Sequence, residues 1–204
     1  VINWLKFTNM LASVIINRTI RPLTSADRAN AFIIDDSMFR RTGYKSTELA
    51  SQVFDHVDMK KRNGFRLMAL GWTDGNTFMP VNSCLLASSD KTQGQGPVYE
   101  YDKRSIAYRR RKMAQTKGTT VMIELIKEAI ELGIQAKYVL FDTWFSNPAQ
   151  ISDVYKLGLN TIAMIKKSEK RKYSFWGNMM TINQIFRTIP KKRGRSSYLL
   201  SVHV

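Results

Sequence analysis

The sequence predicts an α/β fold in which a mixed β-sheet is flanked by helices. Strand-type and helix-type stretches alternate at short spacing between about residues 119 and 165, a pattern typical of an α/β layer with parallel strands. Upstream, two strand-type stretches flank an Asp-Gly turn at Asp74-Gly75. Such a turn between two apolar stretches predicts an antiparallel hairpin, which makes the sheet mixed.

The first half of the chain is expected to hold one helix and then strands. Apolar residues at helical spacing predict a helix within residues 1–20. Ala31-Phe32-Ile33-Ile34 is a buried-strand pattern that we expect to end at Asp35-Asp36-Ser37. The polar stretch 40–62 is expected to be loop with at most a short helix, 64–72 and 77–86 form the hairpin, and 88–97 is an exposed loop.

The second half continues with a helix at about 119–132, a strand at 137–141, a helix at about 148–157 and a strand at 160–165. Glycines 133 and 158 provide the helix C-terminal stops. After Lys166 the residues become basic, aromatic and β-prone, which predicts the start of a β-rich insertion at the C-terminal end. We therefore expect an N-terminal helical segment at 1–23 and a main domain at 24–204, with the insertion at 168–204.

The charge balance points to a polyanionic partner. The chain has 32 Lys and Arg against 16 Asp and Glu, a formal net charge of +16. Such an excess favours nucleic acid or an anionic membrane surface, and the interleaving with aromatic residues favours nucleic acid. The alternative is a basic but otherwise ordinary surface.

Composition also excludes several classes of protein. Hydrophobic residues make up 44% of the chain, too many for a disordered one. No apolar stretch is long enough to span a bilayer, so no membrane role is expected. The single cysteine, Cys84, excludes a disulfide framework and a Cys-rich zinc site. We expect Cys84 to be a buried thiol and the compartment to be the cytoplasm.

Two basic segments are candidate contacts for the DNA backbone, because Lys and Arg neutralise phosphates and neighbouring aromatics can stack on unpaired bases. For each segment the alternative is a merely solvated face. The first holds Lys103, Arg104, Arg109, Arg110, Arg111, Lys112 and Lys117, and the second holds Lys166, Lys167, Lys170, Arg171 and Lys172.

Carboxylates follow two of the predicted strands directly. Asp35 and Asp36 come after the first strand, and Asp142 comes after the strand at 137–141. Functional sites of open α/β sheets lie at the carboxyl ends of strands. Carboxylates there can bind hard divalent cations, and two such ions about 4 Å apart clamp a phosphodiester. Asp also caps turns and helices well, and spacing alone does not separate the two roles.

Three blocks of the sequence resemble a known family. They are Phe32-Ile33-Ile34-Asp35-Asp36-Ser37, Tyr138-Val139-Leu140-Phe141-Asp142-Thr143-Trp144-Phe145-Ser146, and the hairpin from Phe65 through Trp72-Thr73-Asp74-Gly75 to Val81. The chain is similar to the DDE transposases of bacterial insertion sequences, of the large group with a β-rich insertion in a ribonuclease H-like fold. The similarity runs from about residue 24 onward, and the second block is its most specific part.

The resemblance implies metal-dependent DNA strand cleavage and strand transfer at insertion-sequence ends. It implies a site of two aspartates and one glutamate holding two Mg²⁺ (or Mn²⁺) ions. Asp35 matches the first aspartate because it stands two residues before Ser37, and Asp142 matches the second. Asp36 is a rival metal ligand, since neighbours on a strand point to opposite faces.

The third carboxylate has no match. The family's glutamate lies in a C-terminal helix within a Tyr, Arg, Glu, Lys pattern, and Glu169 lacks that context. We expect the glutamate beyond Val204, so that this chain is a fragment, inactive on its own. The implied partners are double-stranded DNA (element ends and target) and a second copy in a homodimer on paired ends, within the bacterial cytoplasm at the nucleoid.

Three hypotheses remain open at this point. The first is the transposase core, the second a ribonuclease H-like nuclease without strand transfer, and the third a non-catalytic nucleic-acid-binding remnant. Trp144 has two interpretations as well: it contacts DNA beside the second aspartate, or it is a packed core aromatic.

Overall fold

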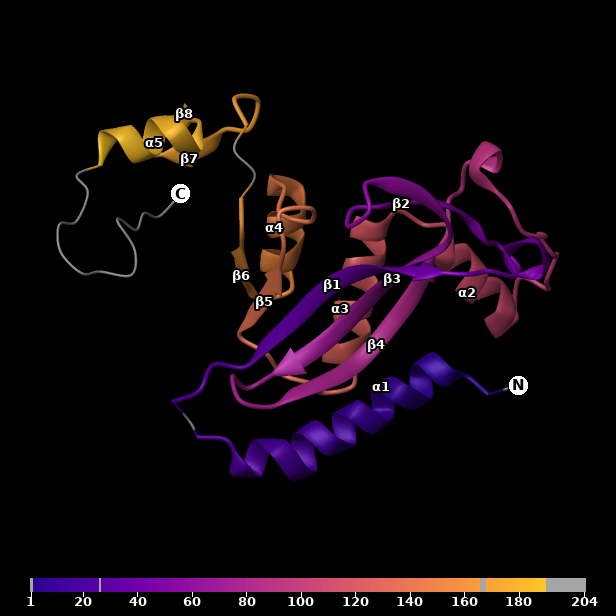
Figure 1. Ribbon diagram of the computed structural model, residues 1–204. Coiled ribbons are helices and arrows are strands. Elements are labelled where there is room, and N and C mark those ends of the chain that lie inside the picture. The colour runs from indigo at the N-terminus through magenta and orange to yellow at the C-terminus, as the bar shows by residue number, and fades with distance from the viewer. Residues whose placement is uncertain (1, 26, 166–167, 190–204) are drawn as a thin grey trace. The chain divides into compact units, whose positions relative to one another are not determined.

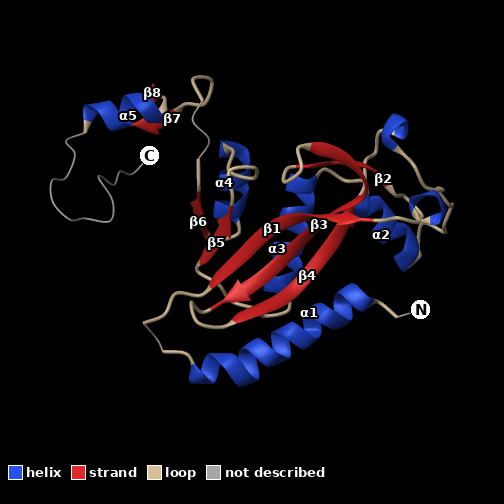
Figure 2. Ribbon diagram, in the orientation of Figure 1, coloured by secondary structure: helices blue, strands red, loops and turns tan. Residues whose placement is uncertain are grey.

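The computed structural model describes residues 2–25, 27–165 and 168–189. The chain forms two compact units, residues 1–164 and residues 165–204. Figures 1 and 2 show that the first unit is built from a sheet and helices.

The sheet of the first unit is organised around β1 (Ala31–Arg40). β1 pairs antiparallel with β3 (Lys60–Thr73) and parallel with β5 (Tyr138–Phe141), and β6 (Asn160–Ala163) pairs parallel with β5. β4 (Phe78–Leu86) and β2 (Ser51–Asp55) pair antiparallel with successive stretches of β3. The structure therefore confirms the predicted α/β class, a mixed sheet flanked by helices as expected for a ribonuclease H-like fold.

Four helices accompany the sheet in the described part of this unit: α1 (Trp4–Ile15), α2 (Ile106–Ala114), α3 (Gly118–Glu131) and α4 (Pro148–Lys156). α1 continues into a π-helical turn, Ile16–Ile20, and a 3₁₀ turn, Arg21–Leu23. α3 packs behind β3 and β4, and α1 runs alongside β4 (Figure 1). The predicted helices at 1–20, 119–132 and 148–157 are thus confirmed.

One face of the sheet forms the main hydrophobic core. Phe32, Ile34, Leu70 and Trp72 point into it from β1 and β3 and are at most 2% exposed. They meet a stripe on α3, one residue of α1 and the first residue of the π-helical turn, namely Val121, Met122, Leu125, Ile126, Ala129, Ala12 and Ile16. Full burial of such a side chain stabilises the fold by about 1.5–3 kcal/mol. This packing fixes β1 and β3 rigidly, and with them the residues that β1 carries.

One expectation about the first half of the chain is wrong, and another is only partly right. β1 does not end at Asp35 but runs on to Arg40, because its pairing with β3 continues through Phe39↔Phe65 to Arg40↔Gly64. Asp35 and Asp36 are therefore mid-strand residues. The stretch 40–62 does contain loop and a short 3₁₀ helix, Tyr44–Ser46, as expected, but it also contains β2 and the start of β3. Pairing with neighbouring strands supplied order that the polar sequence did not signal.

The second unit contains a short hairpin of β7 (Tyr173–Phe175) and β8 (Asn178–Met180), followed by α5 (Ile182–Thr188). α5 begins with a capping box, in which Thr181 and Gln184 bond each other's backbone N–H groups. The segment predicted as β-rich thus also holds a helix. Residues 190–204 of that segment lie outside the described residues.

Cys84 is 7% exposed on β4 and forms no disulfide. Burial raises the pKa of its thiol to about 11, which confirms the predicted buried thiol. Among the described residues, none of the helices has the length and apolar character needed to traverse a bilayer.

Candidate active site

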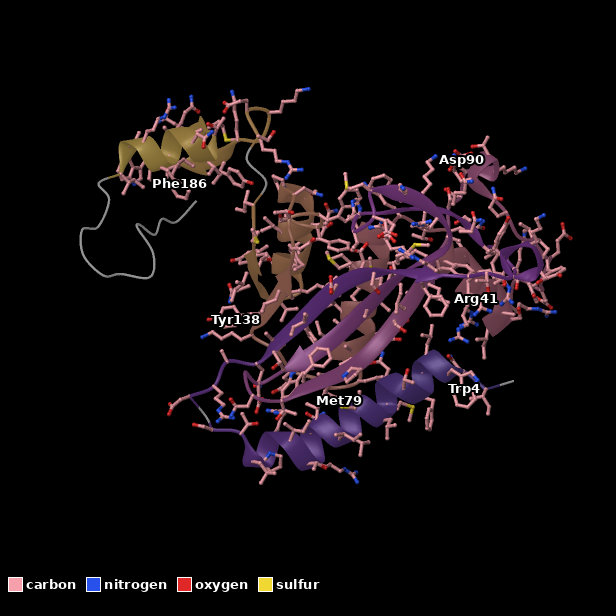
Figure 3. The ribbon with its side chains drawn as sticks, viewed as in Figure 1. Trp4, Arg41, Met79, Asp90, Tyr138 and Phe186 are labelled. Carbon is pink, nitrogen blue, oxygen red and sulfur yellow. The ribbon has the colours of Figure 1, made fainter. Side chains whose placement is uncertain are left out.

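The candidate site lies where β1 runs past the end of β5. The two strands pair in parallel as Ala31↔Tyr138, Phe32↔Val139 and Ile33↔Leu140. Asp35 and Asp142 each lie two residues beyond the last of these pairs, Ile33↔Leu140, and Asp142 is the first residue after β5. Neighbouring strands are about 4.8 Å apart. Figure 3 labels Tyr138 at the start of β5 and Arg41 just beyond the far end of β1, which shows how far β1 continues. Asp35 therefore lies within β1, and Asp142 directly follows the strand that pairs with β1.

The two aspartates of β1 face opposite sides of the sheet. Asp35 is exposed and shares its side with Ile33, and its Oδ1 accepts a hydrogen bond from the N–H of Asp36 at 2.8 Å. Asp36 shares the side of Ile34, and its Oδ2 accepts a hydrogen bond from Nη1 of Arg66 at 2.6 Å. The side chains of Asp36 and Arg66 are only 10% and 19% exposed. Asp36 is thus committed to an ion pair, whereas Asp35 faces solvent.

Asp142 opens the loop that links β5 to α4. Its Oδ1 accepts a hydrogen bond from the N–H of Trp144 at 2.9 Å, so it does serve as a turn cap. Phe145 and Ser146 of the loop are buried, and the Phe145 ring lies edge-on to Phe141 with 6.5 Å between centroids. The Asn147 side chain then caps α4. The carboxylate of Asp142 is exposed at the start of a firmly held loop.

Trp144 is 60% exposed, which contradicts its interpretation as a packed core aromatic. The guanidinium carbon of Arg66 lies 5.7 Å from the centroid of the indole ring, and the ring of His56, just beyond β2, lies 5.4 Å from it. These contacts hold an exposed aromatic two residues from Asp142. Neither Arg66 nor His56 lies in a sequence motif that marks it as part of the site. The available signal was a charged residue, Arg66, two positions from Met68 on the inward face of a strand.

A family model described as the DDE superfamily endonuclease matches residues 6–173, most of the chain. The chain belongs to this family. No curated protein matches it. Membership means nuclease or transposase-type chemistry on DNA for this endonuclease. DDE endonucleases generally use divalent metal ions.

The first basic segment of the endonuclease is largely helical, which sequence analysis did not predict: α2 occupies 106–114 and packs on β4. Some of its basic residues are half-buried and others are exposed. Arg111 is half-buried in an ion pair with Glu48 and lies 4.0 Å from the ring centroid of Tyr101. Arg110 is also half-buried. The exposed members are Lys103, Arg104, Arg109, Lys112 and Lys117, of which Arg104 pairs with Asp102 at 3.0 Å.

The second basic segment lies in the other compact unit. Lys170 and Lys172 are exposed and Arg171 is half-buried. Lys166 and Lys167 lie outside the described residues.

Within residues 2–25, 27–165 and 168–189, no three or more His, Cys, Asp or Glu residues gather as a metal site requires. Glu169 accepts a hydrogen bond from Asn183 at 3.3 Å within the second unit.

Proposed function

We propose that this endonuclease is a transposase core that cleaves and transfers DNA strands at insertion-sequence ends, with Asp35 and Asp142 as its first two catalytic carboxylates. The observation that supports the proposal most is the parallel pairing of β1 with β5, because Asp35 lies two residues beyond Ile33 and Asp142 two residues beyond its partner Leu140. Family membership supports action on DNA. The proposal includes a homodimer assembled on paired DNA ends at the bacterial nucleoid.

The donor set fits Mg²⁺ or Mn²⁺, because hard divalent cations prefer carboxylate oxygens. Among the described residues, no hydrogen bond reaches Oδ2 of Asp35 or Oδ2 of Asp142. Each aspartate thus keeps one oxygen free for a cation while the other oxygen is held by a backbone N–H. Asp36 fits less well, since Arg66 neutralises it. Bound ions would supply charge stabilisation at the phosphodiester and activation of the attacking oxygen.

The chain's own residues would hold the DNA around that point. The exposed basic residues of the first segment would neutralise backbone phosphates, and Lys170 and Lys172 of the second unit would contact phosphates independently. Trp144 presents an exposed ring beside Asp142 and would stack on a base at the cleavage point. Arg111 is not part of this set, because Glu48 already neutralises it.

Iron-mediated backbone cleavage tests the proposed metal site. Fe²⁺ in place of Mg²⁺, with ascorbate and peroxide, cuts a chain near the bound ion. We expect cuts near both residues 35 and 142, competed by Mn²⁺ and lost in Asp35→Asn and Asp142→Asn. The matched control is Asp153→Asn on α4, an exposed aspartate paired with Lys156 at 3.0 Å. Cuts spread evenly over the chain, or unchanged in both variants, would remove the metal site from the proposal.

The two competing functions predict other results. A nucleic-acid-binding remnant would bind duplex DNA but give no localised iron cuts. A nuclease without strand transfer would give the cuts, and in gel assays with Mn²⁺ would nick plasmid without joining a labelled 3′-hydroxyl duplex to it.

A further inference from the structure

Arg66 contacts one residue close in sequence to each of the two proposed catalytic aspartates, namely Asp36 beside Asp35 and Trp144 near Asp142. It sits on β3, and its guanidinium makes three contacts at once. Nη1 donates to Asp36 at 2.6 Å, Nη2 donates to the carbonyl of Phe54 at 2.8 Å, and the guanidinium carbon lies 5.7 Å from the ring centroid of Trp144. One side chain therefore touches β1, β2 and the loop after β5.

Two of the residues that Arg66 contacts, Asp36 and Trp144, each donate a backbone N–H to one of the proposed catalytic carboxylates. On one side the N–H of Asp36 donates to Oδ1 of Asp35 at 2.8 Å. On the other side the N–H of Trp144 donates to Oδ1 of Asp142 at 2.9 Å. The connection thus runs from Asp35 through Asp36, Arg66 and Trp144 to Asp142.

The ion pair of Arg66 and Asp36 has the burial and geometry of a rigid link between β1 and β3. Arg66 and Asp36 are 19% and 10% exposed, so water screens their attraction less than it would at the surface. A planar guanidinium holds its donors in a rigid fork and can stack its flat face on an aromatic ring, a geometry that the ammonium of lysine does not offer. β5 ends at Phe141, so no strand pairing fixes Asp142. Phe145 anchors the loop in the core, and the contacts of Arg66 and His56 with Trp144 join its exposed part to β3 and to the residue just beyond β2.

We propose that Arg66 and Asp36 form a positioning pair that sets the Asp142 loop against β1, so that the oxygens of Asp35 and Asp142 are presented together. The inference rests on the proposed function of those two aspartates. It gives Asp36 a role distinct from metal ligation: the pair acts through Trp144 on the geometry of the site. Such support matters because catalytic groups must be held to within about 0.5 Å.

Hydrogen–deuterium exchange of the loop tests this pair without any metal. We expect the amides of Trp144 and Phe145 to exchange at least about tenfold faster in Arg66→Gln and in Asp36→Asn than in the wild type. Amides of α3 should stay within about twofold, which also shows that the variants are folded. The double variant Asp36→Asn/Arg66→Gln leaves no unpaired buried charge and should match the single variants. The control is Arg104→Gln, which breaks an exposed pair with Asp102.

Mn²⁺ titration by calorimetry gives the second readout. If the pair acts as a unit, both single variants weaken Mn²⁺ binding by the same factor and the double variant is no weaker. If Asp36→Asn abolishes binding while Arg66→Gln leaves it intact, Asp36 is a ligand and the inference is wrong. Unchanged loop exchange in folded variants also overturns it. Failure of the wild type to bind Mn²⁺ would remove the proposed function, while loop exchange would still decide whether the pair holds the loop.

Discussion

Glu48 and Arg111 stand 63 residues apart in the sequence and meet in a two-point ion pair, in which Nε of Arg111 donates to Oε1 of Glu48 at 2.7 Å and Nη2 donates to Oε2. Tyr101 covers the guanidinium and also donates to Glu48. Hydrogen bonding from Arg111 lowers the pKa of Glu48. The pair ties the loop before β2 to α2.

Arg111→Gln is expected to destabilise the fold without weakening DNA binding in proportion. The change leaves a half-buried carboxylate short of its charged partner, which costs about 1–3 kcal/mol. Denaturant unfolding measures the loss of free energy. A large fall in DNA affinity at unchanged stability would contradict the assignment.

Lys112→Gln, at the next residue, is the matched comparison, because it should change DNA binding and not stability. Lys112 is exposed on α2 and makes no ion pair among the described residues, so its loss should leave stability within about 0.5 kcal/mol. If it contacts a phosphate, the slope of log affinity against log salt concentration falls by about 1. Fluorescence anisotropy with a labelled duplex between 50 and 200 mM salt measures the slope. An unchanged slope would mean that this face is merely solvated.

Acid should remove the contribution of Asp74 to stability. Asp74 is 3% exposed and accepts hydrogen bonds from Thr24 at 2.6 Å and from the N–H of Thr77 at 2.7 Å. These bonds lower its pKa from 3.8 to about 2. Because the unfolded carboxyl titrates at the higher value, the contribution is complete above about pH 4 and disappears as pH falls towards 2. Melting temperatures of the wild type and Asp74→Asn should therefore differ most at pH 5 and converge by pH 2; parallel curves would refute this.

Cys84 should resist alkylation in the folded chain. Its thiol is buried and its pKa is raised to about 11, while the thiolate is the reactive form. Iodoacetamide at pH 8, followed by mass spectrometry, should label it at least about a hundredfold more slowly than in denaturant. Fast labelling in the folded state would mean that β4 opens readily.

Gly64→Ala should be among the most destabilising single changes in the sheet. Gly64 pairs with Arg40 of β1 and Ser51 of β2 at a φ of 149°. An added Cβ would lie 2.1 Å from the carbonyl oxygen of Phe39. Backbone has to shift, at a cost of at least about 2 kcal/mol in unfolding free energy. Gly43→Ala, whose Cβ would meet only the Ser46 hydroxyl at 3.7 Å, is the control and should be nearly neutral.

The sequence predicted those elements whose own residues carry the signal. α3 has an apolar stripe and a glycine stop, and β5 is a short apolar stretch, so both were located to within a residue or two. β2 and the second half of β1 are polar, and they are strands because β3 pairs with them. Such pairing depends on residues distant in the sequence, which a local pattern cannot reveal.

The candidate site likewise contains residues that a local sequence pattern reveals and residues that it does not. Asp35 and Asp142 were found because a carboxylate after an apolar stretch is a local pattern. The roles of Asp36 and Arg66 depend on a contact across two strands, 30 residues apart. Similarly, no local pattern distinguishes Arg111 from the other members of the first basic segment, because its partner Glu48 lies 63 residues away.

The central place of β1 has a consequence for how the chain folds during synthesis. β3 begins soon after β1, but β5, its other neighbour, begins roughly 100 residues after β1 ends. At a translation rate of about 5–20 residues per second, one edge of β1 waits about 5–20 seconds for its partner. Phe32-Ile33-Ile34 would be open to mispairing in that interval. The charges of Asp35 and Asp36 directly after it discourage the addition of a foreign strand, so the proposed catalytic carboxylate and its neighbour would also protect the nascent chain.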